Sequence, residues 1–354
     1  MLSKPDSNIL NGCFDERLLV EAYSRLHFGL LEIHPQAPHC FGGIGLMIDR
    51  SSVRLSMTVS RFLEEGSKTG RQDPALDWQD GYWKRRFIDV YDRFEKRHGT
   101  VPLGRIELEQ APVPHVGLGS GTQFACAASA ILNALNLDSP NRASLIDQGR
   151  HVQDILIDSG RGLRSHIGLH GFLHGQMIVD QGKLSLSDSV DTPRTHLQSF
   201  PDQWRVVLVC EDVYQGDWGD NEQSIFDFCS KRENPNRAQM LELIDQQILP
   251  CLQNADYPGA SHAIGLYGEL AGEIFAPAVG DAYRSPRIRY WVDRFRSLGF
   301  QGVGQSSWGP VVFVIVQDDQ QARWLLDKIK VDLIDGSWTD VCAKAGAAKI
   351  QTVR

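Results

Sequence analysis

The sequence predicts an α+β fold with two domains, and three observations support this prediction. The chain has 354 residues, whereas a typical domain has roughly 150. Strand-like and helical segments follow one another in runs and do not alternate regularly, which is typical of α+β proteins. A polar stretch at residues 188–202 separates the two halves. We therefore expect domains at residues 18–190 and 200–354.

The first half is predicted to contain long strands and two clear helices. Apolar and polar residues alternate at residues 46–60 and 105–109, and a mixed pattern at 18–33 also favours a strand. Apolar residues spaced three and four apart predict helices at 77–98 and 122–136. Ser120 followed by Gln123 matches a capping box, so Ser120 is the expected N-cap. Glycines punctuate residues 161–187, which we expect to be extended with a turn at 180–182.

The second half is predicted to contain more helix. Apolar runs indicate buried strands at residues 204–210 and 311–316, and a last strand lies near the C-terminus. The expected helices cover residues 222–232, 237–254, 261–275, 288–298 and 319–330.

Composition excludes several classes of protein. The chain is 42% hydrophobic and 23% charged, which is enough apolar material for a folded core. Its net charge of −8 gives no general attraction to nucleic acid or to anionic membranes. The longest apolar runs are far shorter than the roughly 20 residues of a membrane helix, and the N-terminus resembles no targeting signal. Seven cysteines without a CxxC pair favour reduced thiols. We expect a cytoplasmic protein whose partners include neither nucleic acid nor membrane.

A glycine-rich loop at residues 114–122 is the most informative local feature. It lies between a predicted strand and a predicted helix. Glycines let backbone N–H groups approach a ligand, and a helix N-terminus adds unpaired donors and partial positive charge. The pattern favours a phosphate or pyrophosphate site, and the alternative is a tight turn that merely requires glycine. The loop has neither the lysine of a Walker A motif nor the Rossmann glycine spacing.

Five segments carry a resemblance to a known family. PVPHVGLGSGTQ at residues 112–123 resembles the second motif of the GHMP small-molecule kinase superfamily. Together with RLHFGL (25–30), FGGIGLMID (41–49), RGLRS (161–165) and GVGQSSWGP (302–310), it resembles the β-ribofuranosylaminobenzene 5′-phosphate synthase branch. The resemblance spans about residues 23–316. It implies a GHMP-kinase-like fold, with an N-terminal domain like ribosomal protein S5 and a ferredoxin-like C-terminal domain.

The resemblance implies a condensation and not a phosphoryl transfer. Members of this branch join 5-phosphoribosyl-1-pyrophosphate to 4-aminobenzoate or 4-hydroxybenzoate, with release of pyrophosphate and carbon dioxide, on the route to tetrahydromethanopterin. Such chemistry depends on stabilising a departing anion and on positioning two substrates. The resemblance also implies magnesium with the pyrophosphate, no organic cofactor and a homodimer.

The motifs assign candidate residues to three groups. The proposed catalytic residues are Arg25, His27, Arg161 and Arg164. The proposed phosphate-binding residues are His115, Gly117, Gly119, Ser120, Gly121, Thr122 and Gln123. The proposed substrate-binding residues are Gly43, Gln305, Ser306, Ser307 and Trp308. For Arg161 and Arg164 the alternative interpretation is an exposed surface position. For Trp308 the alternative is packing in the core. No metal ligand is assigned.

Two other functions remain open on the sequence. One is an ATP-dependent kinase of the same superfamily, for which Asp158 or Asp180 would be the base. The other is a phosphosugar-binding protein without turnover. It is suggested by departures from the family pattern at His166, Gln176 and residues 278–281.

Two further clusters are interpreted as structural. His166, His170 and His174 recur every fourth residue, and zinc is the chemical alternative. In an extended segment ligands at that spacing lie roughly 13 Å apart, so zinc is not favoured. Glu269 and Glu273 are expected on the solvated face of a helix.

Overall fold

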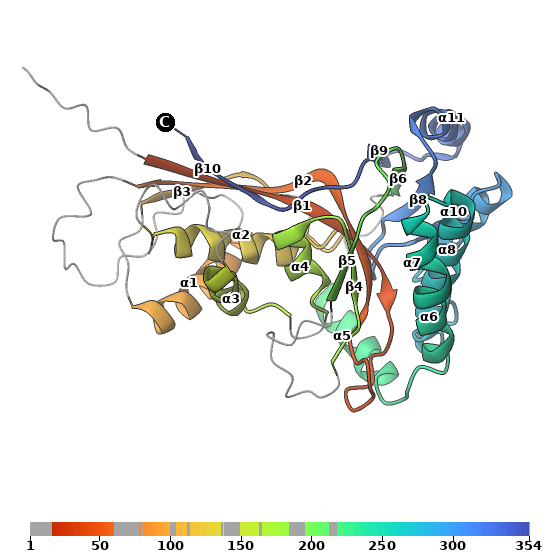
Figure 1. The fold of residues 1–354 in the computed structure, drawn as a ribbon, viewed down its shortest axis with the longest axis horizontal. Helices are drawn as coiled ribbons and strands as arrows, with labels where there is room; N and C mark the ends of the chain where they lie inside the picture. The colour runs from red at the N-terminus through yellow and green to blue at the C-terminus, as the bar shows by residue number, and fades with distance from the viewer. Residues whose placement is uncertain are drawn as a thin grey trace, which may run out of the picture.

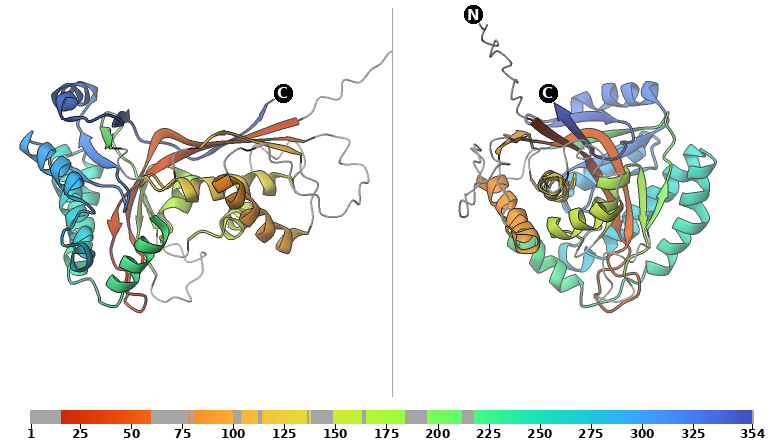
Figure 2. Two further views of the ribbon diagram at one scale, coloured as in Figure 1. Left: turned by 180° about the vertical axis from the view of Figure 1, so that it is seen from behind. Right: turned by 60° about the vertical axis from the view of Figure 1, so that its left-hand side comes forward.

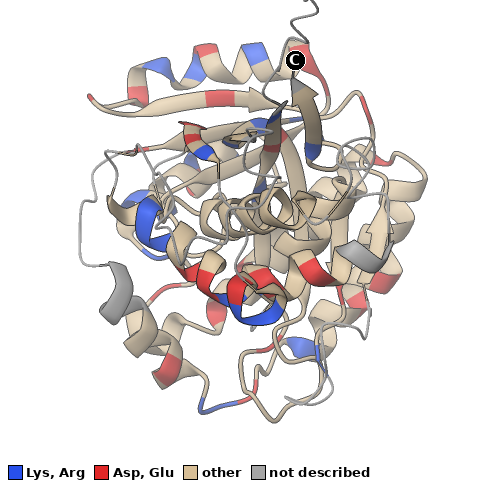
Figure 3. Ribbon diagram, turned by 90° about the vertical axis from the view of Figure 1, so that its left-hand side faces the viewer, with Lys and Arg blue, Asp and Glu red and all other residues tan. Residues whose placement is uncertain are grey.

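The structure is a computed structural model built from two antiparallel sheets with helices packed on them (Figure 1). It describes residues 16–59, 78, 81–99, 104–111, 114–135, 137, 149–162, 165–183, 195–211 and 218–353. In this part of the chain no helix is long and apolar enough to cross a membrane. Acidic and basic residues are interspersed over the face shown in Figure 3.

The first sheet has the order β10-β1-β2-β4-β5, and β3 also pairs with β2. Its strands are β1 (Glu16–Leu30), β2 (Gly43–Val59), β3 (Arg105–Gln110), β4 (Met177–Asp180), β5 (Thr195–Gln198) and β10 (Lys349–Val353). Four helices lie on one side of the long strands in Figure 1 and in the left view of Figure 2. They are α1 (Gly81–His98), α2 (Ser120–Ala134), α3 (Gly149–Ser159) and α4 (Ile167–His174). Trp83 and Phe87 of α1, with Phe124 and Ile131 of α2, bury the apolar side of this layer.

The second sheet has the order β7-β8-β6-β9 and is covered on both faces. Its strands are β6 (Arg205–Cys210), β7 (Val303–Gln305), β8 (Val312–Val316) and β9 (Trp338–Cys342). Successive residues of a strand point to opposite faces. Accordingly Val206 and Leu208 join one buried cluster, and Val207 and Val209 join another.

The helices of the second half pack around this sheet. They are α5 (Trp218–Cys229), α6 (Arg237–Leu243), α7 (Leu249–Gln253), α8 (Tyr257–Glu273), α9 (Ala276–Val279), α10 (Pro286–Ser297) and α11 (Asp319–Ile329). A π-helical turn at Ile244–Ile248 makes α6 and α7 continuous, and the short 3-10 turn Lys330–Asp332 ends α11. One apolar cluster contains residues of β1, β2, β6, β8 and α8, so the two sheets share a core.

Most predicted elements are confirmed within a few residues, but the extended segment at 161–187 was wrong. The helix α4 occupies residues 167–174, and only β4 is extended. Gly168 and Gly171 lowered the expected helix propensity, yet tertiary packing requires them. A Cβ at Gly168 would lie 2.8 Å from Thr122 Cγ2, and one at Gly171 would lie 2.4 Å from Met47 Sδ. Helix α3 was missed as well.

The predicted capping role of Ser120 was also wrong. Ser120 is the first residue of α2, and the N-cap is Gly119 at φ 71°, without a side-chain cap bond. A left-handed backbone favours glycine there.

The polar stretch between the halves contains strand β5, which pairs with β4. At the other end of the chain, β10 returns to the first sheet and pairs with β1. The first sheet therefore takes strands from beyond the expected domain boundary.

Candidate functional site

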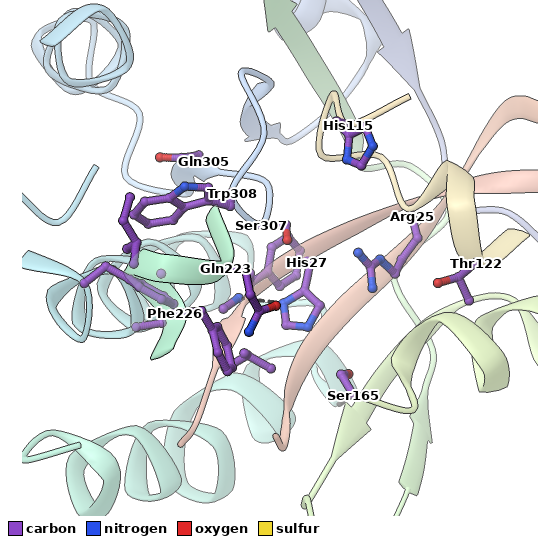
Figure 4. Close-up of a pocket in the computed structure, with 18 of the residues that line it drawn as sticks. Arg25, His27, His115, Thr122, Ser165, Gln223, Phe226, Gln305, Ser307 and Trp308 are labelled. Carbon is purple, nitrogen blue, oxygen red and sulfur yellow. Dashed lines mark hydrogen bonds between the residues drawn. The ribbon is translucent and has the colours of Figure 1, made fainter. Parts of the chain in front are cut away.

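A cavity of about 560 Å³ lies where the two sheets meet (Figure 4). Its walls come from β1, the glycine loop before α2, the segment after α3, helices α5 and α8, and the loop after β7. A smaller recess of about 250 Å³ beside the glycine loop shares several of its wall residues, including Arg25, Arg161 and Trp308. Segments from both halves of the sequence thus enclose one site.

Ser306 joins the two glycine loops at this junction. Its Oγ donates to the Gly117 carbonyl at 2.7 Å and accepts from the His27 N–H at 3.2 Å. The N–H of Ser307 donates to the His27 carbonyl at 2.9 Å. The loop backbones touch directly, because a Cβ at Gly309 would lie 2.2 Å from the Gly117 nitrogen. The glycines are needed for this close approach, and the fully buried Ser306 hydroxyl is occupied within the protein.

The first glycine loop lies directly against arginine side chains. A Cβ at Gly119 would lie 3.0 Å from Arg25 Nε, and a Cβ at Gly121 would lie 3.6 Å from Arg161 Nη2. Gly117, Gly119, Ser120 and Gly121 line the smaller recess together with Thr122. The first residues of α2 line this recess, so the helix N-terminus borders it. Loop, helix N-terminus and guanidinium groups therefore form an environment suited to an anion.

Three arginines supply the positive charge of the site. Arg25, Arg86 and Arg161 line both the cavity and the recess. Burial lowers the pKa of Arg25 to about 10. Burial, and secondarily the neighbouring Arg86, lowers the pKa of Arg161. Arg25 stays protonated at neutral pH, and its buried Nε has no hydrogen-bond partner within the described part of the chain. No aspartate or glutamate occurs among the described residues that line either space.

His27 is a neutral hydrogen-bond donor at the centre of the cavity. Its Nδ1 accepts from the Gly29 N–H at 3.1 Å, so the proton lies on Nε2. Burial, and then the charge of Arg25, hold the pKa of His27 well below its usual 6.5. The ring thus offers an N–H to a ligand.

The opposite end of the cavity is aromatic. The rings of Phe275 and Trp308 lie 4.6 Å apart between centroids, and those of Phe226 and Phe275 lie 6.5 Å apart. Sequence reasoning found Trp308 but missed Phe226, Phe275 and Arg86. Nothing local distinguishes these three from ordinary helix residues, because only the tertiary structure brings α1, α5 and the end of α8 to one cavity.

The remaining predicted residues have different positions. Gln305 and Ser307 line the cavity, as does His115, whose Nε2 lies 3.2 Å from the Tyr82 hydroxyl. Gln123 is buried and donates to the Gly168 carbonyl, and Gly43 packs against the Gly29 carbonyl. Neither of these two is among the residues that line the cavity. Arg164 lies outside the described residues.

Both candidate kinase bases are engaged elsewhere. Asp180 accepts hydrogen bonds from the backbone N–H groups of His166 and Gly182, at 2.8 and 2.9 Å. Asp158 is fully buried and pairs with Arg97 at 2.6 Å. Neither lines the cavity.

The histidines of the second cluster contact one another along α4, edge to face between His166 and His170 and stacked between His170 and His174. The ring centroids of His166 and His170 lie 6.3 Å apart, and those of His170 and His174 lie 6.0 Å apart. The extended geometry expected for them was wrong, since they lie on a helix. Across the described ranges, no group of three His, Cys, Asp or Glu side chains could hold a metal ion. Glu269 pairs with Arg296 at 2.8 Å, and Glu273 accepts from Asn236.

Comparison with known proteins identifies relatives of this chain in sequence. Residues 248–330 match the family described as GHMP kinases C terminal. The chain is 21% identical to the β-ribofuranosylphenol 5′-phosphate synthase of Methanothermobacter thermautotrophicus, over 85% of this chain and 89% of that one. It is 26% identical to the synthase of the same name from Archaeoglobus fulgidus, over 84% and 87%. This chain is homologous to these synthases.

Solved structures confirm the fold. The homoserine kinase of Cytophaga hutchinsonii superposes with a TM-score of 0.61 at 13% identity, covering 99% of this chain and all of that one. The mevalonate diphosphate decarboxylase of Staphylococcus aureus gives 0.62 at 14% identity, covering 96% and 99%. The protein therefore has the two-domain GHMP-kinase fold that the motifs implied.

Proposed function

We propose that this protein condenses 5-phosphoribosyl-1-pyrophosphate with 4-hydroxybenzoate or 4-aminobenzoate, in tetrahydromethanopterin biosynthesis. The bond from ribose C1 to the pyrophosphate oxygen breaks, and pyrophosphate leaves with the electron pair. A carbon–carbon bond forms between ribose C1 and the ring carbon that carries the carboxylate. The bond to the carboxylate then breaks, its electron pair returns to the ring, and carbon dioxide departs. The product is a β-ribofuranosyl-benzene 5′-phosphate.

The observation that carries this proposal is the pairing of an arginine-rich end with an aromatic end in one cavity. One substrate is a phosphorylated sugar and the other a benzene ring, so each end suits one of them. The sequence relationship to the β-ribofuranosylphenol 5′-phosphate synthases supports the same reaction. The name of these synthases describes a phenol product, which favours 4-hydroxybenzoate as the acceptor.

The residues of the cavity act by stabilising charge and by positioning. Negative charge develops on the pyrophosphate as the C1–O bond breaks, and preformed donors stabilise it. Arg25, Arg161 and the N-terminus of α2 supply charge-assisted donors. The Nε2–H of His27 adds a neutral donor beside them. Holding both substrates in one cavity supplies the effective concentration that a bimolecular step requires.

The kinase alternative has less support. Phosphoryl transfer to a hydroxyl needs a positioned base, and Asp158 and Asp180 are held in structural contacts. The described lining of the cavity offers no other carboxylate.

The binding-protein alternative rested on departures from the family pattern at positions that are not among the described lining residues, but His166 and Asp281 directly adjoin the lining residues Ser165 and Ala282. Asp281 pairs with Arg289 and accepts from the Tyr283 N–H, so it has a structural role. Gln176 adopts φ 62° at the end of α4, and His166 packs against Gly162. The product assay below tests the binding-protein alternative, because ligand binding without product would support it.

Magnesium, a homodimer and a cytoplasmic location remain predictions. The described lining suits an anion and presents no carboxylate for a cation. We therefore assign magnesium, if it takes part, to the phosphate oxygens of the substrate and not to a protein site. The six cysteines that the structure describes are free thiols.

The test is a product assay with purified protein. Phosphoribosyl pyrophosphate, magnesium and carboxyl-labelled 4-hydroxybenzoate or 4-aminobenzoate are incubated together, and labelled carbon dioxide is counted. We expect release that requires both substrates and is strongly reduced in Arg161→Gln. Absence of release from either acid, with a folded protein that binds phosphoribosyl pyrophosphate, would contradict the proposal. ATP consumption with a panel of sugars and alcohols would then test the kinase.

A further inference from the structure

We infer that the acceptor ring binds in the aromatic end of the cavity, against Phe226, Phe275 and Trp308. The phosphoribosyl substrate occupies the opposite end. This inference rests on the proposed function and adds to it the position and orientation of the second substrate.

The lining residues divide the cavity into two lobes. Arg25, Arg86 and Arg161 line both the smaller recess and the main cavity, and we call this end the cation lobe. Phe226 and Phe275 line the main cavity alone, and we call their end the aromatic lobe. Figure 4 shows Arg25, His115 and Thr122 on one side, Phe226 and Trp308 on the other, and His27 and Ser307 between them.

The aromatic lobe suits a benzene ring better than a sugar or a phosphate. Its apolar walls are formed by Phe28, Leu30, Ile225, Phe226, Ala271 and Phe275. Of the described residues that line this end, none carries a charge. Ribose hydroxyls and phosphate oxygens would lose hydration here without a charged partner. An aromatic ring instead gains contacts with Phe226, Phe275 and Trp308, which remain partly accessible.

Trp308 is held in place for this contact. The Arg284 guanidinium donates through Nη1 to the Trp308 carbonyl at 2.8 Å. The backbone N–H of Arg284 donates to Gln305 Oε1 at 3.0 Å, so Arg284 also contacts the start of the loop that carries Trp308. Phe275 packs at 51° against the indole from the other side. A ligand therefore meets a preformed aromatic surface.

The chemistry then sets the orientation of the ring. The carbon that carries the carboxylate must face ribose C1 at the junction near His27 and Ser307. The para substituent points into the aromatic lobe. The carboxylate is attached to this same carbon and therefore lies at the junction between the cation lobe and the aromatic lobe, where it leaves as carbon dioxide once the new carbon–carbon bond has formed.

The experiment compares Phe275→Leu with Phe228→Leu. The second position lies on α5, is 51% exposed and does not line the cavity. Equilibrium binding of 4-hydroxybenzoate and of phosphoribosyl pyrophosphate is measured separately by calorimetry, together with both KM values. We expect Phe275→Leu to weaken binding of the aromatic acid about 10-fold, because it removes aromatic contacts from the ring site. The affinity of Phe275→Leu for phosphoribosyl pyrophosphate should stay within about twofold of the wild-type value. Phe228→Leu should change the affinity for neither ligand.

Each outcome bears on the inference by itself. If Phe275→Leu weakens phosphoribosyl pyrophosphate and leaves the acid unchanged, the aromatic lobe holds the ribose and the inference is wrong, even where the wild type turns over. If the wild type fails to release carbon dioxide, the proposed function fails. Loss of 4-hydroxybenzoate binding in the variant would still support the ring site. Should Phe275→Leu not fold, Phe226→Leu gives the same comparison.

Discussion

Replacing Ser306 by alanine tests whether the contact between the two glycine loops builds the cavity. The substitution removes one oxygen atom and leaves the backbone unchanged. That oxygen makes two hydrogen bonds, to the Gly117 carbonyl and from the His27 N–H. Because Ser306 is fully buried, water does not easily replace them.

The expected loss of stability follows from these two bonds. A buried polar group left without its partner costs about 1–3 kcal/mol. The His27 N–H lies in a buried residue, whereas Gly117 is half-buried and regains part of its hydration. The free energy of unfolding should therefore fall by about 2–4 kcal/mol. Turnover should fall as well, since His27 and the first glycine loop lose their common anchor.

Urea unfolding followed by tryptophan fluorescence measures the first effect, and the carbon dioxide assay measures the second. Ser297→Ala is the control, because it removes an exposed hydroxyl that bonds only to the neighbouring Arg294 carbonyl. It should change the free energy of unfolding by less than about 0.5 kcal/mol. If Ser306→Ala matches Ser297→Ala in stability and keeps full turnover, the loop contact does not organise the site.

Three further predictions follow from the same structure. Arg161→Gln should lower kcat/KM for phosphoribosyl pyrophosphate by about 10-fold or more, because a charge-assisted contact is lost. Steady-state kinetics would measure this, with the exposed Arg232→Gln as the control. Equal kcat/KM values for the two variants would contradict the prediction. Gly117→Ala should abolish anion binding measured by calorimetry, since its φ is 92° and a Cβ would lie 2.4 Å from the Ser306 carbonyl oxygen. Burial lowers the pKa of His170 to about 4. Below pH 6.5 this histidine is therefore protonated in the unfolded chain but stays neutral in the folded chain. The free energy of unfolding decreases as the pH falls from 6.5 towards 4. His170→Gln should reduce this loss by about 1.5 kcal/mol between pH 6.5 and 5, measured from urea midpoints, and an unchanged pH dependence would refute the prediction.

The glycine loop was predictable as a candidate anion site because its signal is local. The glycines and the helix start are adjacent in the sequence, and hydrogen-bond geometry at a helix N-terminus depends on few residues. Arg25, His27, Arg161 and Trp308 lie far from this loop in the sequence. They were predicted from the family motifs, and all four line the cavity. Their roles in the reaction remain proposals.

The residues of the aromatic lobe show no comparable pattern in the sequence. Phe226 and Phe275 lie on elements about 50 residues apart in sequence and look like ordinary core-facing residues. The helical state of residues 167–174 was also hidden, since Gly168 and Gly171 weaken helix propensity but admit Thr122 and Met47.

From the sequence alone one could predict the α+β class, the glycine loop before α2 and the relationship to the synthases. Hydrophobic periodicity and short-range backbone geometry encode these features within a few neighbouring residues. Only the tertiary structure decided which wall residues face one another, that β10 completes the first sheet and that Ser306 ties the loops together. Those features depend on contacts between residues up to several hundred positions apart, where shape and burial override local preference.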